Sequence, residues 1–443
     1  MNKLPQIDNA SHKNILIIGY GISGKSAYGF LKKKGHNVYV FDDANLGEIP
    51  DKITVVDWEK IDFVVKSPSV PILEHNRHKI IKQAFENNKP VVSTFDIFRL
   101  YNPKAKIIAV TGTNGKSTTT ALTYHILKEA GFSVCLGGNI GFPYFDLEQT
   151  EWYVFEMSSY ELASSQYLDF EVACVLNIEP DHMEFHGSFE NYAKAKHEAL
   201  EHAKLRIISY EDKLTMNKYR NADNTLTVSM EYNDDADVYV YERTLRDKNS
   251  KELILDLAGI LNLRGKHNYQ NIGFAYSICN KLGAPTKEIL KSIQSFKPLP
   301  HRMNIVRKIK NTIFVNDSKA TNPSSAATAL ATFVGYKIYW LVGGRSKKID
   351  PMPYVKNYMA EVRKIYLFGE ATDEYEKAFN GVKNTVRCGT MTSALNSAFK
   401  DASKEPGPSA ILLSPMCASF DQFKDYEHRG EEFVKMANAI NQQ

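Results

Sequence analysis

The stretch Ala109–Thr120 constrains the fold of this chain more than any other part of its sequence. It follows an apolar run, 106–110, that predicts a buried strand, and it leads into a helical pattern from Lys116 to about Ala130. A strand, a turn of small residues and a helix N-terminus form an anion site, because free backbone N–H groups and the positive end of the helix dipole face one point. Lys116 adds a charge for β- and γ-phosphates, and Ser117 adds a hydroxyl for Mg²⁺. The stretch therefore predicts a nucleoside-triphosphate site.

This loop departs from the pattern G-x-x-x-x-G-K-[ST] at one position, where Val110 stands in place of the first glycine. Residues Thr111–Thr113 form the first half of the variant loop. The alternative is a tight βα turn with an incidental Lys-Ser pair, which the agreement of strand, loop and helix disfavours.

A second glycine-rich turn, Gly19–Gly24, lies near the N-terminus after an apolar run, 14–18. It matches G-x-G-x-x-G and opens a helix to about Lys34. The next strand, 38–41, ends at Asp42-Asp43, near the offset of about 20 residues at which dinucleotide folds place a ribose-binding acid. By itself the turn is compatible with NAD or with another phosphate-bearing ligand. A strand at 63–66 and helices near 75–87 and 94–100 complete a Rossmann-like domain.

Two strands that follow the phosphate loop end in polar residues. The strand 152–155 ends at Glu156, and the strand 171–178 leads to Asp181-His182. An acid at the end of a strand near such a loop commonly holds Mg²⁺, the alternative being a solvent-exposed acid. The next helix, 189–203, carries Lys194 and Lys196, which by themselves indicate a solvated face.

The remainder of the chain predicts a β-meander over 235–265, helices over 265–280 and 287–295, and a linker over 296–300. Strands at 303–306, 312–315, 337–342, 364–368 and 410–413 then alternate with helical sequence. Polar residues again cluster after strand ends, where open α/β sheets bind ligands. We therefore expect an α/β protein of three domains, with boundaries near Pro103 and Pro298: 1–102, Rossmann-like; 103–298, a P-loop ATPase-type parallel sheet; and 299–443, Rossmann-like.

Composition excludes several classes of protein. The net charge of +4, from 55 basic and 51 acidic residues, does not favour a nucleic-acid partner or a membrane surface. Five scattered cysteines without a C-x-x-C pair favour reduced thiols and disfavour a zinc site. No apolar run approaches the roughly 18–20 residues that span a bilayer. We expect a soluble cytoplasmic protein.

Six signals stand in a characteristic order: Thr111–Thr120, Glu156, Asp181-His182, Gly265–Asn271, His301-Arg302 and Asn316–Asn322. In this order they resemble the Mur ligases, the ATP-dependent amide-forming enzymes of peptidoglycan precursor synthesis. The segment Leu413–Gly430 is similar to that of the D-glutamate-adding branch, and the Asp-Asn-Pro-Arg sequence of the diamino-acid-adding branch is absent.

The resemblance implies a reaction as well as a fold. The γ-phosphate of ATP would move to the carboxylate of UDP-N-acetylmuramoyl-L-alanine, and the amine of D-glutamate would attack the resulting acyl phosphate. Such phosphoryl transfer needs alignment and charge neutralisation more than a protein nucleophile. We expect a monomer with no nucleic-acid partner and no membrane insertion, and the joints near Pro103 and Pro298 would allow its three domains to hinge.

The resemblance also assigns roles to individual residues. ATP would contact Gly112, Thr113, Asn114, Gly115, Lys116, Ser117, Thr118, Asn268, Asn271, Arg302 and Asp317. The UDP substrate would contact Ile22, Ser23, Gly24, Asp42, Asp43, Ser67, Asn139 and His182. D-glutamate would contact Lys319, Thr321, Lys347, Ser419 and Tyr426. Two Mg²⁺ ions would be held through Ser117, Glu156, His182 and Lys196, and the catalytic set would be Lys116, Glu156, His182, Lys196 and Lys319.

For Lys196 the resemblance reverses what the helix pattern indicates. In the family, the lysine of a Tyr-x-x-x-Lys helix is carbamylated by CO₂ and becomes an anionic metal ligand, and Tyr192 with Lys196 has that spacing. This chemistry requires a neutral amine, hence a lysine whose pKa is lowered by burial or by nearby cations. The chain departs from the family at Ser69, where a glycine is usual, and at Ala44, where an arginine is common.

Three alternatives compete with this interpretation. A folylpolyglutamate synthase also carries a Gly-Lys-Ser loop and a carbamylated lysine, but the extra N-terminal domain and Ala418–Phe423 disfavour it. A nucleotide-binding switch would not need Lys319 and a second set of carboxylate-binding residues. A dehydrogenase is the third alternative, and it would rest on the Gly19–Gly24 turn.

Overall fold

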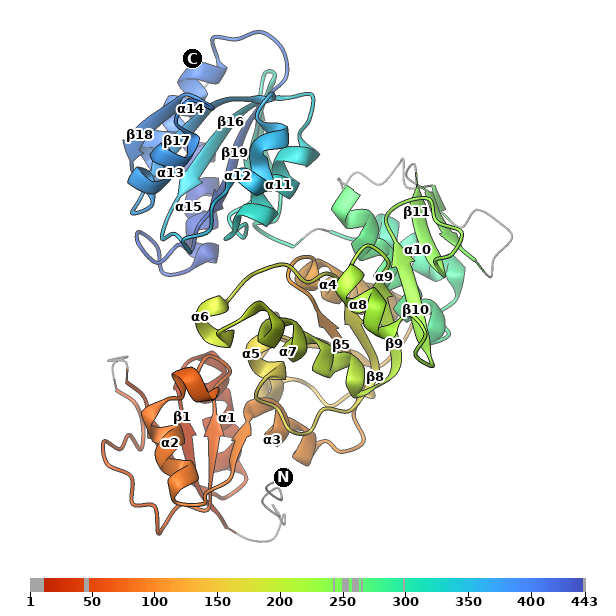
Figure 1. Cartoon of the computed structure of the whole chain (residues 1–443), viewed down its shortest axis with the longest axis vertical. Coiled ribbons are helices and arrows are strands. Elements are labelled where there is room, and N and C mark those ends of the chain that lie inside the picture. The colour runs from red at the N-terminus through yellow and green to blue at the C-terminus, as the bar shows by residue number, and fades with distance from the viewer. Residues whose placement is uncertain are drawn as a thin grey trace. The chain divides into compact units, whose positions relative to one another are not determined.

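The computed structural model describes residues 12–43, 48–241, 244–248, 255–256, 263, 266–297 and 299–440, and the side chains of 255–256 and 266–267 are not described. The chain divides into two compact units (Figure 1). The first comprises Met1–Leu261 and Asn268–Phe296, and the second comprises Asn262–His267 and Lys297–Gln443. Ala44, Gly265 and Pro298, which entered the sequence analysis, lie outside the described residues.

The first sheet has the strand order β2-β1-β3-β4 and is parallel throughout. Its strands are β1 Asn14–Ile18, β2 Asn37–Phe41, β3 Phe63–Lys66 and β4 Val91–Ser93. Side chains alternate between two covered faces: Ile15 and Ile17 pack with α1 (Ile22–Lys33), whereas Leu16 and Ile18 pack with α2 (Lys79–Glu86).

The helix expected near 75–87 is shorter than the sequence suggested. A 3₁₀ turn, η1 (Glu74–Asn76), comes first, and α2 begins only at Lys79. The His78 ring caps α2 by accepting a hydrogen bond from the Ile80 N–H (3.2 Å), which fixes the helix start at this point.

Helix α3 (Thr94–Tyr101) belongs to two hydrophobic cores at once. Its Ile97 packs with the first sheet, while Phe95 and Phe98 pack with Phe155 and Phe170 of the second sheet. The helix joins the first sheet to the second within one compact unit.

The second sheet has the order β13-β12-β11-β10-β9-β8-β5-β7-β6 and is parallel from β6 to β11. Its last two pairings, β11–β12 and β12–β13, are antiparallel. These strands lie within the meander expected over 235–265, and they are the part of it that the structure describes. The strands are β5 Lys106–Thr111, β6 Val134–Gly138, β7 Trp152–Glu156, β8 Phe170–Val175, β9 Ala203–Ser209, β10 Thr225–Ser229, β11 Val238–Tyr241, β12 Thr244–Asp247 and β13 Leu255–Asp256.

The helices of this region are α4 Lys116–Glu129, α5 Ser159–Leu162, α6 Met183–His186, α7 Phe189–Glu201, α8 Lys213–Tyr219, α9 Lys266–Lys281 and α10 Thr286–Ser295, with a 3₁₀ turn, η2, at Tyr144–Asp146. The strand expected over 171–178 ends at Val175. Beyond it the chain leaves the sheet, because Asn177 and Glu179 form hydrogen bonds with the phosphate loop instead of a neighbouring strand.

The third sheet, in the second unit, has the order β14-β15-β19-β16-β17-β18, and only the β14–β15 pairing among the described strands is antiparallel. The strands are β14 Asn304–Ile309, β15 Thr312–Asn316, β16 Lys337–Gly343, β17 Val362–Phe368, β18 Thr385–Gly389 and β19 Ser409–Met416. The helices are α11 Pro323–Thr332, α12 Met352–Val355, α13 Thr372–Phe379, α14 Met391–Ala402 and α15 Tyr426–Ala439, with a 3₁₀ turn, η4, at Lys356–Tyr358.

Both faces of this third sheet are covered. Along β16, Trp340 packs with α11, α12 and α13, and its neighbours Tyr339 and Leu341 pack with α14 and α15. This alternation is typical of a doubly wound α/β sheet, which presents its strand ends to ligands. Within the described part of the chain, no helix combines the length and apolarity that crossing a membrane requires.

Candidate functional site

The phosphate loop lies between β5 and α4 and takes a conformation that requires glycine. Gly115 has φ +86°, and a Cβ at this position would lie 2.5 Å from Oδ1 of Asn271. The Lys116 ammonium turns back over the loop and donates to the carbonyl oxygens of Gly112 (2.9 Å) and Thr113 (2.8 Å). Ser117 and Thr118 form the buried first turn of α4. The arrangement is that of an anion-binding helix N-terminus with an attached cation.

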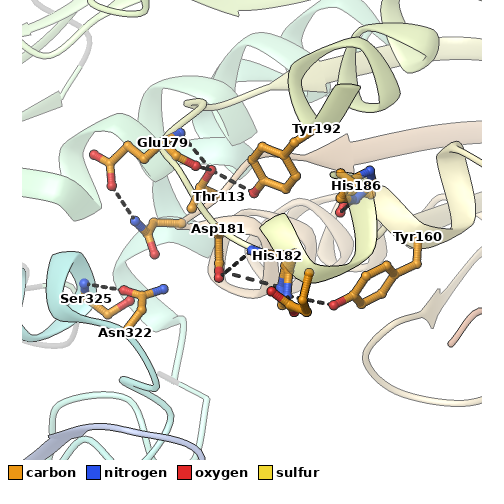
Figure 2. Close-up of polar contacts among 12 residues, drawn as sticks. Thr113, Tyr160, Glu179, Asp181, His182, His186, Tyr192, Asn322 and Ser325 are labelled. Carbon is orange, nitrogen blue, oxygen red and sulfur yellow. Dashed lines mark hydrogen bonds and ion pairs between the residues drawn. The ribbon is translucent and has the colours of Figure 1, made fainter. Parts of the chain in front are cut away.

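The segment after β8 holds the loop in place. The Thr113 N–H donates to the Asn177 carbonyl (2.8 Å), and the Asn114 N–H donates to Asn177 Oδ1 (2.8 Å). The Thr113 hydroxyl lies 2.9 Å from the hydroxyl of Tyr192 and accepts from the Glu179 N–H (2.9 Å), as Figure 2 shows. Asn177 was not singled out from the sequence, and its role follows from the chain leaving the sheet at Val175.

Helix α9 brings Asn268 and Asn271, which the resemblance predicts to contact ATP, to the start of α4. Asn271 accepts from the Thr119 hydroxyl (3.1 Å) and donates to Asn268 Oδ1 (2.9 Å). Gln270, which the sequence analysis missed, donates to the Leu176 carbonyl (3.2 Å) and so ties the same helix to the end of β8.

Lys196 is buried, with 1% of its surface exposed, and its Nζ donates to the Gly112 carbonyl at 2.7 Å. Burial, together with the Lys116 charge, holds the pKa of Lys196 well below its usual value, although Asp181 and Glu156 act in the opposite direction. The solvated lysine face predicted from the helix pattern is therefore wrong for Lys196, and it holds for the exposed Lys194. Burial and the Lys116 charge therefore act in the direction of the neutral amine that carbamylation would require.

Glu156 ends β7 and is buried beside Asn139, which follows β6. Asn139 donates through its amide to Glu156 Oε1 (2.8 Å) and through its N–H to the Glu156 carbonyl (2.9 Å). Gly138, at φ +91°, permits this approach, since a Cβ there would lie 2.5 Å from the same carbonyl oxygen. Two residues predicted for different ligands are thus in direct contact.

His182 caps α6 in a left-handed conformation, with φ +57°. Its N–H donates to Asp181 Oδ1 (3.0 Å), and its Nδ1 lies 2.6 Å from the Tyr160 hydroxyl, as Figure 2 shows. The Nε2 atom lies 3.5 Å from Asp181 Oδ2. Tyr160 was not identified from the sequence, because its contact with His182 depends on how α5 and α6 pack.

The first glycine-rich turn is closed by side chains from its own sheet. The Ser67 hydroxyl donates to the Gly19 carbonyl (2.7 Å), and Asp42 accepts from the Tyr20 N–H (2.5 Å). A Cβ at Gly24 would lie 1.9 Å from the Gly19 oxygen, so helix α1 starts at the closest possible distance to β1. Ile22 and Ser23 begin this helix, and Ile22 is 78% exposed.

Asp43 is engaged differently from Asp42. Its carboxylate contacts Lys79 (2.8 Å) and His78 (2.6 Å) of the α2 start, and these hydrogen bonds hold the pKa of Asp43 below its usual value. Asp43 is therefore a link between β2 and α2 as well as a candidate for binding the UDP substrate.

In the second unit the predicted residues follow the ends of β15, β16 and β19. Burial raises the pKa of Asp317 to about 7, against the hydrogen bond from the Ser414 hydroxyl (2.8 Å) and the charge of Arg302. The Lys319 ammonium lies 4.8 Å from the centre of the Tyr426 ring, and Thr321 donates its N–H to the Lys319 carbonyl (2.9 Å).

Two other predicted residues lie in neighbouring turns of this unit. Ser419 is buried after β19 and accepts the Phe423 N–H at its carbonyl (3.0 Å). Lys347 is half-buried in the turn after β16.

A buried arginine that the sequence analysis missed supports the Lys319 loop. Arg429 of α15 is fully buried and donates to the Ser318 hydroxyl (2.9 Å), the Ser318 carbonyl (2.7 Å) and the Cys417 carbonyl (3.1 Å). Burial lowers the pKa of Arg429 to about 10. These bonds connect Ser318, just before Lys319, and Cys417, two residues before Ser419, to one helix.

No cluster of three or more His, Cys, Asp or Glu side chains arranged for a metal occurs among the residues that the structure describes.

Comparisons with known proteins cover nearly the whole chain. The Mur ligase middle domain matches residues 110–279, and the Mur ligase glutamate ligase domain matches residues 301–417. UDP-N-acetylmuramoylalanine–D-glutamate ligase of Wolbachia pipientis is 32% identical over 97% of both chains. The enzyme of that name from Mesorhizobium japonicum is 35% identical over 97% of this chain and 96% of its own.

Solved structures share the fold at lower identity. UDP-N-acetylmuramate–alanine ligase from Thermotoga maritima has a TM-score of 0.63 at 18% identity and covers 97% of this chain and 100% of its own. MurF ligase from the same organism, in complex with ADP, has a TM-score of 0.57 at 18% identity, over 97% and 96% of the two chains.

Proposed function

Because this chain belongs to the Mur ligase family, we propose that it is an ATP-dependent ligase that joins D-glutamate to UDP-N-acetylmuramoyl-L-alanine. The observation that carries the proposal is the end-to-end similarity to D-glutamate ligases, at 32% and 35% identity. We further propose that residues 1–102 bind the UDP substrate, 103–298 bind ATP and 299–443 bind D-glutamate, in a monomer that works in the cytoplasm.

The phosphate loop supports ATP as the energy source. Gly112, Thr113, Asn114 and Gly115 would surround the phosphates, and Lys116 would leave the loop carbonyls to meet them. By the family resemblance, Arg302 and Asp317 would also contact the nucleotide. The hydrogen-bonded Asn268–Asn271 pair supports the loop through α4, because Asn271 accepts from the hydroxyl of Thr119, one turn after Gly115.

The donors near the loop fit Mg²⁺, which prefers oxygen ligands and keeps several waters. Ser117 and Glu156 would hold one ion, and His182 with a carbamate on Lys196 would hold a second. Bound there, Mg²⁺ would neutralise charge on the transferring phosphoryl group.

A carbamate would form when the neutral amine of Lys196 adds to CO₂ and loses a proton. Burial and the Lys116 charge favour the neutral amine. The Tyr192 ring, 4.6 Å from Nζ, limits where the new group can point.

We assign the two other substrates to residues that follow strand ends. Ile22, Ser23 and Gly24 at the start of α1 would bind the diphosphate, Asp42, Asp43 and Ser67 the uridine end, and Asn139 the reactive end of the UDP substrate. Lys319, Thr321, Lys347, Ser419 and Tyr426 would bind the carboxylates of D-glutamate and orient its amine.

In the proposed reaction these residues orient and stabilise rather than attack. The loop and Lys116 would hold the γ-phosphate in line with the substrate carboxylate, giving an acyl phosphate and ADP. The amine of D-glutamate would then attack the acyl carbon, lose a proton and expel phosphate. Asn139 and His182 would keep the acyl group in place between the two steps.

Phosphate release with a panel of substrates tests the proposal. We expect release from ATP only when UDP-N-acetylmuramoyl-L-alanine and D-glutamate are both present. Release that depends on an L-amino acid or on a folate would contradict it, and so would nicotinamide reduction with any candidate substrate.

A further inference from the structure

We propose that Asn76 is a positioning residue for the helix that begins at His182: its side-chain amide binds the C-terminal carbonyls of α6 from the loop between β3 and α2. Only the effect on ligation rests on the proposed function. The contact itself is a property of this chain.

Two segments that are far apart in the sequence meet at the end of α6. Asn76, in the 3₁₀ turn η1, donates from Nδ2 to the carbonyl oxygen of Phe185 (2.7 Å), and a longer contact reaches the carbonyl oxygen of Glu184 (3.4 Å). The His75 ring lies against Gly187, since a Cβ on this glycine would be 3.0 Å from the ring. Gly187 ends the helix with φ +75°. The amide of Asn76 therefore satisfies carbonyls that a helix C-terminus leaves without an intrahelical partner.

Helix α6 is so short that this contact lies one turn from His182. The His182 carbonyl accepts from the N–H groups of Phe185 (3.1 Å) and His186 (3.1 Å). A helix of one turn is not stable by itself, because ordering its residues costs more than its few hydrogen bonds gain. Its place is therefore fixed by contacts from outside. Helix α7 supplies one, from Asn191 to the His186 carbonyl (2.9 Å), and Asn76 supplies another.

The loop that carries Asn76 also carries residues of the candidate UDP-substrate site. Ser67, which closes the first glycine-rich turn, begins the loop, and His78, which contacts Asp43, ends it. The His78 N–H donates back to the Pro71 carbonyl (3.0 Å) and holds the loop together. One loop thus contacts both the residues that would bind the UDP substrate and the helix of His182.

The chemistry of the contact predicts an order among substitutions at position 76. Carbonyls at a helix C-terminus carry partial negative charge, so the site needs a donor. Asn76→Ala removes the donor and leaves the carbonyls to water. Asn76→Asp keeps the shape of the side chain but places a carboxylate oxygen against the Phe185 carbonyl oxygen. The aspartate variant should therefore loosen α6 more than the alanine variant, although it is the closer replacement in size.

The first test measures amide hydrogen exchange in the full chain and needs no enzyme activity. We expect the N–H groups of Phe185 and His186 to be protected in the wild type and to exchange about 2- to 10-fold faster in Asn76→Ala. They should exchange faster still in Asn76→Asp. Unprotected amides in the wild type, or an aspartate variant no faster than the alanine variant, would overturn the inference even in an active ligase.

Asn87→Asp is a matched control. Asn87 lies in the same region of the chain, directly after α2, and its Nδ2 also donates to a carbonyl at a helix end, that of Gln83 (2.8 Å). This substitution should leave the exchange of the α6 amides unchanged. If it accelerated their exchange as much as Asn76→Asp does, the effect would be general loosening, and the inference would fail.

The second test measures what the position of α6 does. We expect Asn76→Asp to lower kcat for ligation by about 10- to 100-fold, because His182 would be displaced from the reacting end of the substrate. The affinity for UDP alone, measured by calorimetry, should not change, and Asn87→Asp should keep the wild-type kcat. An unchanged kcat in Asn76→Asp, or a loss of UDP affinity as large as the loss of kcat, would overturn the inference. A wild type that does not ligate would refute the proposed function, and the exchange measurement would still decide this one.

Discussion

Replacing Lys196 by alanine is expected to abolish ligation and to open a cavity that a short carboxylate can enter. The amine is buried and donates a 2.7 Å hydrogen bond to Gly112 in the middle of the phosphate loop. A carbamate on this residue would be the only part of the side chain that reaches a metal. Acetate or propionate in the cavity would restore a negative oxygen donor without a covalent link.

The size of the effect follows from burial. Lys196→Ala removes three buried methylene groups, and with the cavity that remains the expected cost is about 2–4 kcal/mol of unfolding free energy. Loss of one electrostatic contact to a transferring phosphoryl group typically lowers kcat by about 10²–10³-fold. Lys196→Met fills the same space without an amine, so its stability should stay within about 1 kcal/mol of the wild type.

The pair of variants separates chemistry from packing. Both should be inactive in phosphate release, but only Lys196→Ala should be partly rescued by acetate, because methionine leaves no room. A ¹³C carbamate signal after equilibration with labelled bicarbonate should appear in the wild type and be absent from both variants. Full activity of Lys196→Ala without added carboxylate, or equal rescue of the two variants, would refute the reasoning.

Three further substitutions test other parts of the chain. Gly24→Ala should raise KM for the UDP substrate, since its Cβ would lie 1.9 Å from a backbone oxygen. Gly29→Ala in the same helix is the control: its Cβ meets nothing within 4 Å, so the free energy of unfolding should increase by about 0.5–1 kcal/mol and KM should not change. Equal KM values would contradict this. The unfolding free energy of Asp317→Asn should rise relative to that of the wild type from about pH 4 to about pH 7 and then level off. The wild-type acid contributes stability below its unfolded pKa of about 3.9 and loses it as pH rises through the folded pKa of about 7. Denaturant titrations check the sign, and a pH-independent difference would refute it. Arg429→Met should lower the free energy of unfolding by about 1–3 kcal/mol and raise KM for D-glutamate but not for ATP. An unchanged KM for D-glutamate would show that Arg429 does not support the D-glutamate site.

The phosphate loop could be predicted from sequence because all its determinants are local. The strand, the glycines, Lys116 and the helix are contiguous, so pattern and chemistry agree without knowledge of packing. The same holds for the turn at Gly19–Gly24. The end of β8 could not be predicted this way: the apolar run continues past Val175, but the hydrogen-bond partners of Asn177 and Glu179 belong to the loop.

Lys196 illustrates what periodicity cannot supply. Its hydrogen-bond partner, Gly112, lies 84 positions earlier in the chain. The polar and apolar pattern of α7 classes lysine as polar and carries no information about this distant contact. Ala193, Ala195 and Ala199 are buried in the same helix as Lys196, so most of this part of α7 faces the protein interior. Arg429 was missed for the same reason, since the carbonyls that it satisfies come from segments that meet only in the folded sheet.

The contact between the two lysines has a consequence for the proposed chemistry. Lys116 and Lys196 both donate to the Gly112 carbonyl, and the charge of Lys116 is one cause of the lowered pKa of Lys196. The same charge that favours the neutral amine would attract the carbamate once CO₂ has added, because addition reverses the sign of the group from potential cation to anion. When ATP draws Lys116 onto its phosphates, that attraction would pass to the metal beside the carbamate. One lysine can therefore favour both the formation of the carbamate and its later use, without any change in the fold around it.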